Sequence, residues 1–148
     1  MWRSGCFAVN AARLGMTRTK DDAIVAYTSS VLGFAPLALT AVYSATKAAL
    51  HSYALSQRFM LCDTKVRVLE IAPPWVRTEL MNSQEAEPAM PLNQFIAAAI
   101  KALGTDANEI VIEAAKTMRN NPGPAEHGFV NDFNTRMLAL FSGQATAN

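Results

Sequence analysis

The pattern of apolar and polar positions divides most of the chain into short strand-like and longer helix-like segments. Residues 23–30 (AIVAYTSS) form a short apolar run with β-branched members, which predicts a strand buried on both faces of a parallel sheet. Residues 42–61 are rich in alanine and repeat apolar positions at helical spacing, so they predict a long helix. Residues 65–72 (KVRVLEIA) alternate and predict a second strand. Pro73 and Pro74 end it, because proline cannot donate to a ladder.

The same pattern continues, more weakly, after the second strand. Residues 78–90 are polar and predict a loop or a short helix. Asn93 is in place to cap a helix over residues 94–103 that Gly104 closes, and residues 109–113 (EIVIE) predict a short strand. This order of strand, helix, strand, helix, strand indicates an α/β fold with crossover connections and a parallel sheet.

The C-terminal part predicts one more helix. Residues 120–128 are rich in turn-forming residues, and the tail after Gly143 is expected to fray. Four apolar side chains recur every four positions on one helix face, which favours core packing or a subunit contact over a cofactor site. They are Phe129, Phe133, Met137 and Phe141.

Composition restricts the class of protein. Of the 148 residues, 51% are hydrophobic and 17% are charged, which argues against disorder, and a net charge of +1 favours neither nucleic acid nor a membrane as partner. Cys6 and Cys62 form neither a disulfide framework nor a zinc motif, and His51 is expected to be a surface or packing residue, so we expect no metal site. A reducing, cytoplasmic setting fits, although the basic residues up to Lys20 also allow a mitochondrial targeting segment.

Tyr43 and Lys47 form the first candidate for chemistry. Their spacing of four places both side chains on one face of the predicted helix. A free tyrosine titrates near pH 10, and a nearby ammonium favours the phenolate, which makes the phenol a usable general acid or base at neutral pH. The pair alone is a weak signal, because Lys47 could equally be a solvated helix residue.

Two further elements follow predicted strand ends, where ligands gather in open α/β sheets. The hydroxyl of Ser30 could hold a substrate carbonyl, or Ser29 and Ser30 could simply end the strand and begin a turn. The segment PPWVRT, residues 73–78, is stiffened by proline and would expose backbone groups to a ligand. The alternative is a turn without function.

Together these segments resemble the short-chain dehydrogenase/reductase family of NAD- or NADP-dependent oxidoreductases. The resemblance rests on IVAYTSS, VYSATKAALHSY and VRVLEIAPPWVRT, which occur in the family's order and spacing between residues 23 and 78. The PPWV variant and the stretch MPLNQFIAAAIKAL are similar to the subgroup often labelled DltE-like. The resemblance implies a Rossmann-like fold and hydride transfer between nicotinamide and a small carbonyl or alcohol substrate.

The resemblance also implies roles for individual residues. Tyr43 would exchange the proton with the substrate oxygen, Lys47 would favour its phenolate and bind the cofactor ribose, and Ser30 would orient the substrate. Tyr43, Lys47, Pro73, Val76 and Thr78 would together bind NAD or NADP. The helix over residues 42–61 would contribute to a subunit interface.

The chain departs from the family pattern in two places. Pro74 replaces the glycine that usually follows the first proline of the loop, which removes a backbone N–H. No glycine-rich turn for the cofactor pyrophosphate precedes Ser30. We therefore expect an atypical segment over residues 1–22, the catalytic half of the fold over residues 23–141, and a flexible tail over residues 142–148.

Three functional readings are left open by the sequence. The first is the oxidoreductase, although a truncated sheet makes activity of this chain alone doubtful. The second is a non-catalytic remnant that acts as an oligomerisation or interaction module, because an exposed apolar strand edge invites pairing with a second copy or another family member. The third, a serine hydrolase, ranks low because no GxSxG motif and no histidine–acid pair stand out near Ser30.

Overall fold

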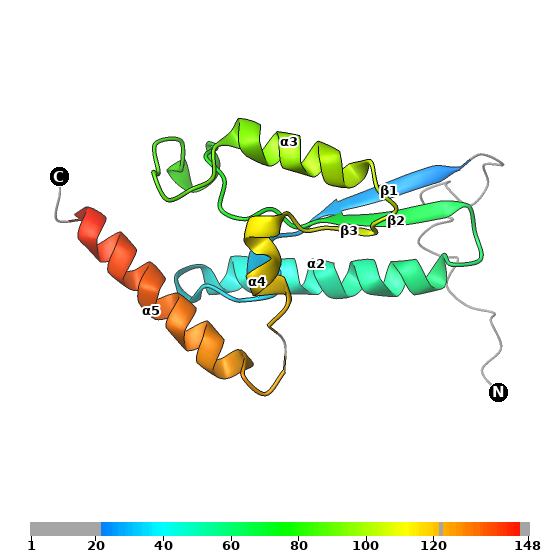
Figure 1. Ribbon diagram of the computed structural model, residues 1–148. Helices are drawn as coiled ribbons and strands as arrows, with labels where there is room; N and C mark the ends of the chain where they lie inside the picture. The colour runs from blue at the N-terminus through cyan, green and yellow to red at the C-terminus, as the bar shows by residue number, and fades with distance from the viewer. Residues whose placement is uncertain (1–21, 122, 146–148) are drawn as a thin grey trace.

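The computed structural model describes residues 22–121 and 123–145, which fold as a parallel sheet with helices on both faces (Figure 1). Strand β1 (Ala23–Thr28) pairs with β2 (Val66–Ile71), which pairs in turn with the short β3 (Glu109–Ile110), and both pairings are parallel. Helix α2 (Ala41–Met60) lies on one face of the sheet and α3 (Leu92–Leu103) on the other. The predicted α/β class is confirmed. Shorter helices complete the chain: the 3-10 turns Val31–Gly33, Ala38–Thr40, Leu80–Asn82 and Glu113–Ala115, and helix α4 (Lys116–Arg119).

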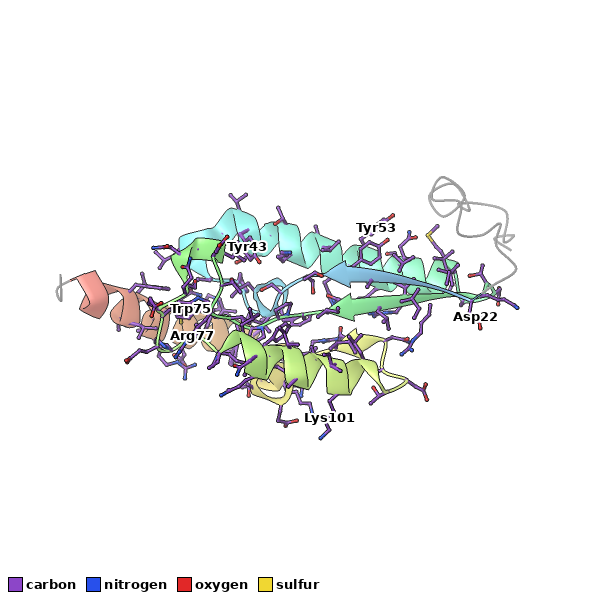
Figure 2. All side chains as sticks on the ribbon, turned by 90° about the horizontal axis from the view of Figure 1, so that it is seen from above. Asp22, Tyr43, Tyr53, Trp75, Arg77 and Lys101 are labelled. Atoms are coloured by element: carbon purple, nitrogen blue, oxygen red, sulfur yellow. The ribbon has the colours of Figure 1, made fainter. Side chains whose placement is uncertain are left out.

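Helix α5 (Glu126–Ala145) lies beyond the carboxyl ends of the strands. It is seen there in both views, at the end of the molecule toward which the strand arrows point (Figures 1 and 2). The amide of Asn134 anchors it, with Oδ1 accepting from Ala38 N at 2.5 Å and Nδ2 donating to the Pro36 carbonyl at 2.9 Å. These contacts place α5 beside the loop that follows β1.

Strand β1 differs from its prediction because only one of its faces is covered. Its residues alternate between partly buried and exposed, and the side chain of Ile24 is 58% exposed. The inward residues Val25 and Tyr27 pack against a core of Leu61, Val66 and Val68. β1 is an edge strand of the described sheet and no described element covers its outer face, so the expectation of burial on both faces was wrong.

Several element boundaries also differ from the sequence expectation. Helix α3 begins at Leu92 with Pro91 at its N-cap, and the Asn93 side chain accepts only from the adjacent Gln94 amide, so Asn93 is not the cap. Strand β3 has two residues because the chain turns into a 3-10 helix at Glu113. The last helix continues past Gly143, where we expected fraying.

Candidate functional site

A cavity of about 350 Å³ opens at the carboxyl ends of β1 and β2. Its position agrees with the general rule that open α/β sheets bind ligands at this edge. Figure 2 shows Tyr43 and Trp75 at this end of the molecule, whereas Tyr53 lies farther along α2. The structure brings all six predicted site residues to the cavity lining: Ser30, Tyr43, Lys47, Pro73, Val76 and Thr78.

Ser30 has one structural contact and one hydroxyl proton to spare. Its Oγ accepts from Leu32 N at 3.2 Å and thereby caps the 3-10 turn that follows β1. Since a hydroxyl both donates and accepts, the cap leaves its proton available to an oxygen in the cavity. Ser29 also lines the cavity, but its hydroxyl donates to the Glu70 carboxylate at 2.6 Å. The two adjacent serines therefore use their hydroxyl protons differently.

Tyr43 and Lys47 lie one turn apart on α2 and both face the cavity. Lys47 Nζ is 5.4 Å from the centroid of the Tyr43 ring and donates to the Thr28 carbonyl at 2.8 Å. That bond uses one of three ammonium protons, so donors remain for a ligand. No hydrogen bond joins the Tyr43 hydroxyl to any residue that the structure describes, which leaves it open to a ligand as well.

The loop after β2 presents backbone groups to the cavity. The Pro73 carbonyl is already engaged, because it accepts from Val31 N at 3.1 Å and continues the pairing of β1 with β2. Val76 forms a parallel bridge with Met90 in which Trp75 O and Arg77 N make the bonds. In such a bridge the N–H and C=O of Val76 itself point away from Met90. The carbonyl accepts a long bond from the Thr78 hydroxyl at 3.5 Å, and no described residue accepts from the N–H, which is open to a ligand.

Trp75 and Arg77 fix the next stretch of this loop, a role that the sequence reading missed. Trp75 Nε1 donates to Ser83 Oγ at 2.8 Å. The Arg77 guanidinium donates to three backbone carbonyls, those of Ala86, Glu87 and Ala89, at 2.9–3.1 Å. Because each of these bonds joins the start of the loop to a later part of it, the two side chains hold residues 78–89 in place beside the cavity.

The opposite wall of the cavity comes from α5. Three members of the apolar stripe predicted for core packing or a subunit contact line the cavity, namely Phe133, Met137 and Phe141. The Phe141 ring lies 5.6 Å from that of Trp75. Helical spacing reveals that such side chains share a face, but it does not reveal what the face covers.

A cluster of charged side chains lies beneath the cavity. Glu70 is fully buried near the carboxyl end of β2, and its carboxylate accepts from Ser29 and pairs with His51 Nδ1 at 2.8 Å. Arg58 lies 3.7 Å from the same carboxylate. A charged residue inside the apolar run VRVLEI was a signal that such partners exist, because buried charges are almost always paired.

Glu109 extends this cluster toward α4 and raises the question of a metal. It pairs with Arg119 at 2.7 Å and lies 3.7 Å from His51. Ligand atoms of His51, Glu70 and Glu109 lie within 4.8 Å of one another, a spacing that could hold a cation. The guanidiniums of Arg58 and Arg119 already balance the two carboxylates, however, so we interpret the group as an ion-pair cluster.

The same geometry argues against the hydrolase reading. A serine nucleophile needs a base within hydrogen-bonding reach of its hydroxyl. Ser29 donates to Glu70, and His51 pairs with that same carboxylate instead of with a serine. Ser30 contacts the Leu32 amide.

Comparison with known protein families identifies the family to which the chain belongs. The model of the short chain dehydrogenase family matches residues 4–89, more than half of the chain. The chain belongs to this family. The match begins inside residues 1–22, the segment that the motifs had set apart as atypical. Residues 1–21 of that segment lie outside the described part of the structure.

Individual relatives agree with membership in the short-chain dehydrogenase family. The chain is 52% identical over 61 residues to the uncharacterized oxidoreductase DltE of Bacillus subtilis, a stretch that covers 41% of this chain and 24% of that protein. It has the fold of a short chain dehydrogenase from Burkholderia cenocepacia solved in complex with NADP, with a TM-score of 0.63 and 21% identity. A putative short-chain dehydrogenase from Novosphingobium aromaticivorans gives a TM-score of 0.51 at 16% identity.

The comparisons with solved short-chain dehydrogenases cover most of this chain but only part of each solved chain. The fold matches include 86% and 95% of this chain but 56% and 53% of the two solved chains. The chain therefore spans little more than half the length of the solved relatives. None of the helices among the described residues is long and apolar enough to cross a membrane.

Proposed function

We propose that this protein is an NAD(P)-dependent oxidoreductase that interconverts a carbonyl compound and its alcohol. The observation that carries the proposal is the meeting of the Tyr43 hydroxyl, the Lys47 ammonium and the Ser30 hydroxyl at one cavity. The NADP bound to the Burkholderia relative supports the choice of cofactor class. The nicotinamide would supply or accept the hydride.

In this proposal the contacts seen in the structure position the side chains for their roles. Ser30 donates its spare proton to the substrate oxygen while Leu32 N holds the side chain in place. Tyr43 exchanges the proton with the same oxygen, and the Lys47 ammonium lies beside it, 5.4 Å from the centroid of its ring. The contact between Lys47 and the Thr28 carbonyl keeps the ammonium at the cavity floor.

The donor set also fits the nicotinamide end of the cofactor. The N–H of Val76 and the hydroxyl of Thr78, which now makes a long bond to the Val76 carbonyl, could bind the carboxamide, and the remaining ammonium protons of Lys47 could bind the ribose. Pro73 would contribute its ring surface, since its carbonyl is bonded to Val31. Within residues 22–121 and 123–145 we find no glycine-rich turn for a pyrophosphate, so the proposal concerns the nicotinamide end.

A pair of tyrosines on the same helix provides the test. We expect Tyr43→Phe to lower turnover of NADPH with a carbonyl substrate by at least about 100-fold, since general acid–base catalysis contributes roughly 10²–10⁴. Tyr53→Phe is the matched control, because Tyr53 packs edge-on against Tyr27 away from the cavity and should keep full turnover. Turnover that survives in Tyr43→Phe refutes the role of Tyr43.

Cofactor binding can be measured without a substrate. Titration of NADPH and NADH fluorescence with the 148-residue chain should show saturable binding. A folded chain that binds neither nucleotide while a longer relative does would favour the alternative, a non-catalytic interaction module.

We also propose that the chain associates through surfaces that the described residues leave uncovered. β1 is an edge strand, and Val42 and Phe59 on α2 are 79% and 80% exposed. Unpaired edges and exposed apolar side chains favour pairing with a second copy or another family member. Light scattering after size-exclusion chromatography checks this proposal, and a stable monomer at micromolar concentration contradicts it.

A further inference from the structure

The cavity lining is apolar except where the proposed catalytic residues lie. Apart from Lys47, the lining residues carry no charge, and its hydroxyl groups gather around Ser30, Tyr43 and Thr78. The rest of the wall is formed by large apolar side chains from five segments: the loops after β1 and β2 and the helices α3, α4 and α5. These include Leu37, Trp75, Phe95, Met118, Phe133 and Met137.

We propose that the substrate is an uncharged, apolar ketone, aldehyde or secondary alcohol, and that the cavity face of α5 selects it. This inference rests on the proposed function, because it assigns the hydroxyl end of the cavity to the reacting oxygen. The apolar end would then receive the hydrocarbon part of the same molecule. The selecting side chains are Phe133, Met137 and Phe141.

The charges near the cavity support an uncharged substrate. Lys47 is held at the floor by Thr28, where the proposed reaction needs it. The Arg77 guanidinium is used by backbone carbonyls of its own loop, and that of Arg119 pairs with Glu109. A carboxylate or phosphate on the substrate would lose its hydration without gaining a free cation, so it should weaken binding.

The α5 wall is held firmly enough to discriminate. Asn134, which follows Phe133 and precedes Met137 by about one turn, ties the helix to Pro36 and Ala38. Phe141 packs on Trp75 nearer the C-terminal end of the helix. A volume of about 350 Å³ lies near the lower limit of pockets for small molecules, about 300–1,000 Å³. The nicotinamide would share this space, so the hydrocarbon part of the substrate is expected to be short to medium in length.

A series of methyl ketones from 2-butanone to 2-nonanone tests the apolar end. Binding is followed without cofactor through the emission of Trp75 in a Trp2→Phe background, and turnover is followed by NADPH oxidation. Each added methylene that is buried should tighten binding about fourfold, the equivalent of about 0.8 kcal/mol. We expect 8-oxononanoate, in which a carboxylate replaces the terminal methyl group of 2-nonanone, to bind at least tenfold more weakly than 2-nonanone.

Neighbouring residues of α5 provide the matched variants. Met137 lines the cavity, whereas Leu138 is 46% exposed and does not. Met137→Asp should remove most of the dependence on chain length, and Leu138→Asp should preserve it, although both place the same residue in the same helix. If circular dichroism shows that Met137→Asp is unfolded, Met137→Ala should reduce the dependence.

The possible outcomes separate the two proposals. Binding that tightens with chain length in the absence of turnover supports the substrate class and counts against the proposed reaction. Equal affinity for 2-butanone and 2-nonanone, or equal or tighter binding of the keto acid, overturns the substrate class. Equal effects of Met137→Asp and Leu138→Asp overturn the selecting role of α5.

Discussion

The cavity and the charged cluster beneath it are built from adjacent residues but use their polar groups in opposite ways. In the cluster, the fully buried Glu70 carboxylate is surrounded by Ser29, His51 and Arg58. In the cavity, the hydroxyls of Ser30 and Tyr43 keep protons that no described residue accepts. Polar groups that satisfy one another hold a fold together, whereas polar groups left open at a cavity are available for a ligand.

The cavity and the charged cluster share secondary-structure elements. Ser29 and Ser30 follow β1 as neighbours, and His51 on α2 lies one turn beyond Lys47. Glu70 therefore joins the strand end that carries Ser30 to the helix that carries Tyr43 and Lys47. Changes in the cluster should lower stability, and changes in the cavity should spare it.

The largest effect is expected at Glu70. Glu70→Ala leaves Arg58, His51 and Ser29 without their shared carboxylate inside the protein, and breaking a buried charge pair costs about 3–5 kcal/mol. Urea unfolding followed by circular dichroism measures the change in the free energy of unfolding. The contrasting cavity variant is Tyr43→Phe, which removes a hydroxyl with no bonded partner among the described residues and should stay within about 0.5 kcal/mol. Equal losses in both variants would contradict the division between the two regions.

Gly33 sits where the turn after β1 meets α2 and gives the next largest effect. A Cβ at this position would lie 3.0 Å from the Lys47 carbonyl carbon and oxygen and 3.2 Å from Ala48 N. These are backbone atoms that cannot rotate away, so Gly33→Ala should cost about 1–3 kcal/mol and displace Lys47.

Gly128 is the matched control for Gly33. A Cβ there meets nothing within 4 Å, and Gly128 lies in helix α5. Gly128→Ala should therefore raise the free energy of unfolding by up to about 1 kcal/mol. Thermal melts of both variants should move in opposite directions, and a shift in the same direction would refute the close packing of the turn on α2.

Much of this architecture could be predicted from local pattern. The helix expected over residues 42–61 is observed as Ala41–Met60, and the strand expected over residues 65–72 as Val66–Ile71. Both carry strong periodicity and clear ends, such as Pro73 after the second strand. The sequence also identified residues that meet at the cavity, because residues after parallel strands converge on one edge.

The errors arose where tertiary contacts decide. The outer face of β1 is exposed because no described element covers it, and an apolar run by itself does not report on coverage. Pro91 precedes α3, although Asn93 has the better capping side chain. The apolar face of α5 was predicted to pack in the core or against a subunit, and three of its side chains line the cavity, because periodicity defines a face and only the fold defines its neighbour.

A smaller effect is expected at Lys47, which lies between the two regions. Lys47→Met keeps the apolar stem and loses the hydrogen bond to the Thr28 carbonyl, so it should cost about 0.5–1.5 kcal/mol. Lys101→Met changes an exposed lysine on α3 and should be neutral within about 0.5 kcal/mol. Chemical unfolding distinguishes them, and a loss at Lys47 as large as that at Glu70 would place this residue with the cluster.

The smallest effect concerns Tyr27, which packs beside Tyr53 and, like Tyr53, does not line the cavity. Burial, and secondarily the neighbouring Tyr53, raise the pKa of Tyr27 above its ordinary value of 10. Above pH 10 the unfolded chain loses this proton more readily than the folded chain does. Stability that is fully present below pH 10 should therefore decline as the pH rises through the higher pKa of the folded state.

The test of this decline is a set of thermal melts between pH 9 and pH 11.5 on the protein and on Tyr27→Phe. The variant lacks the titrating group, so its melting temperature should fall less steeply in this range. Tyr53→Phe removes the secondary causes and leaves burial, so its slope should lie between the other two. Parallel slopes in all three proteins would mean that Tyr27 ionises alike in the folded and unfolded chains. The packing of β1 on α2 would then be too loose to exclude water from the tyrosine pair.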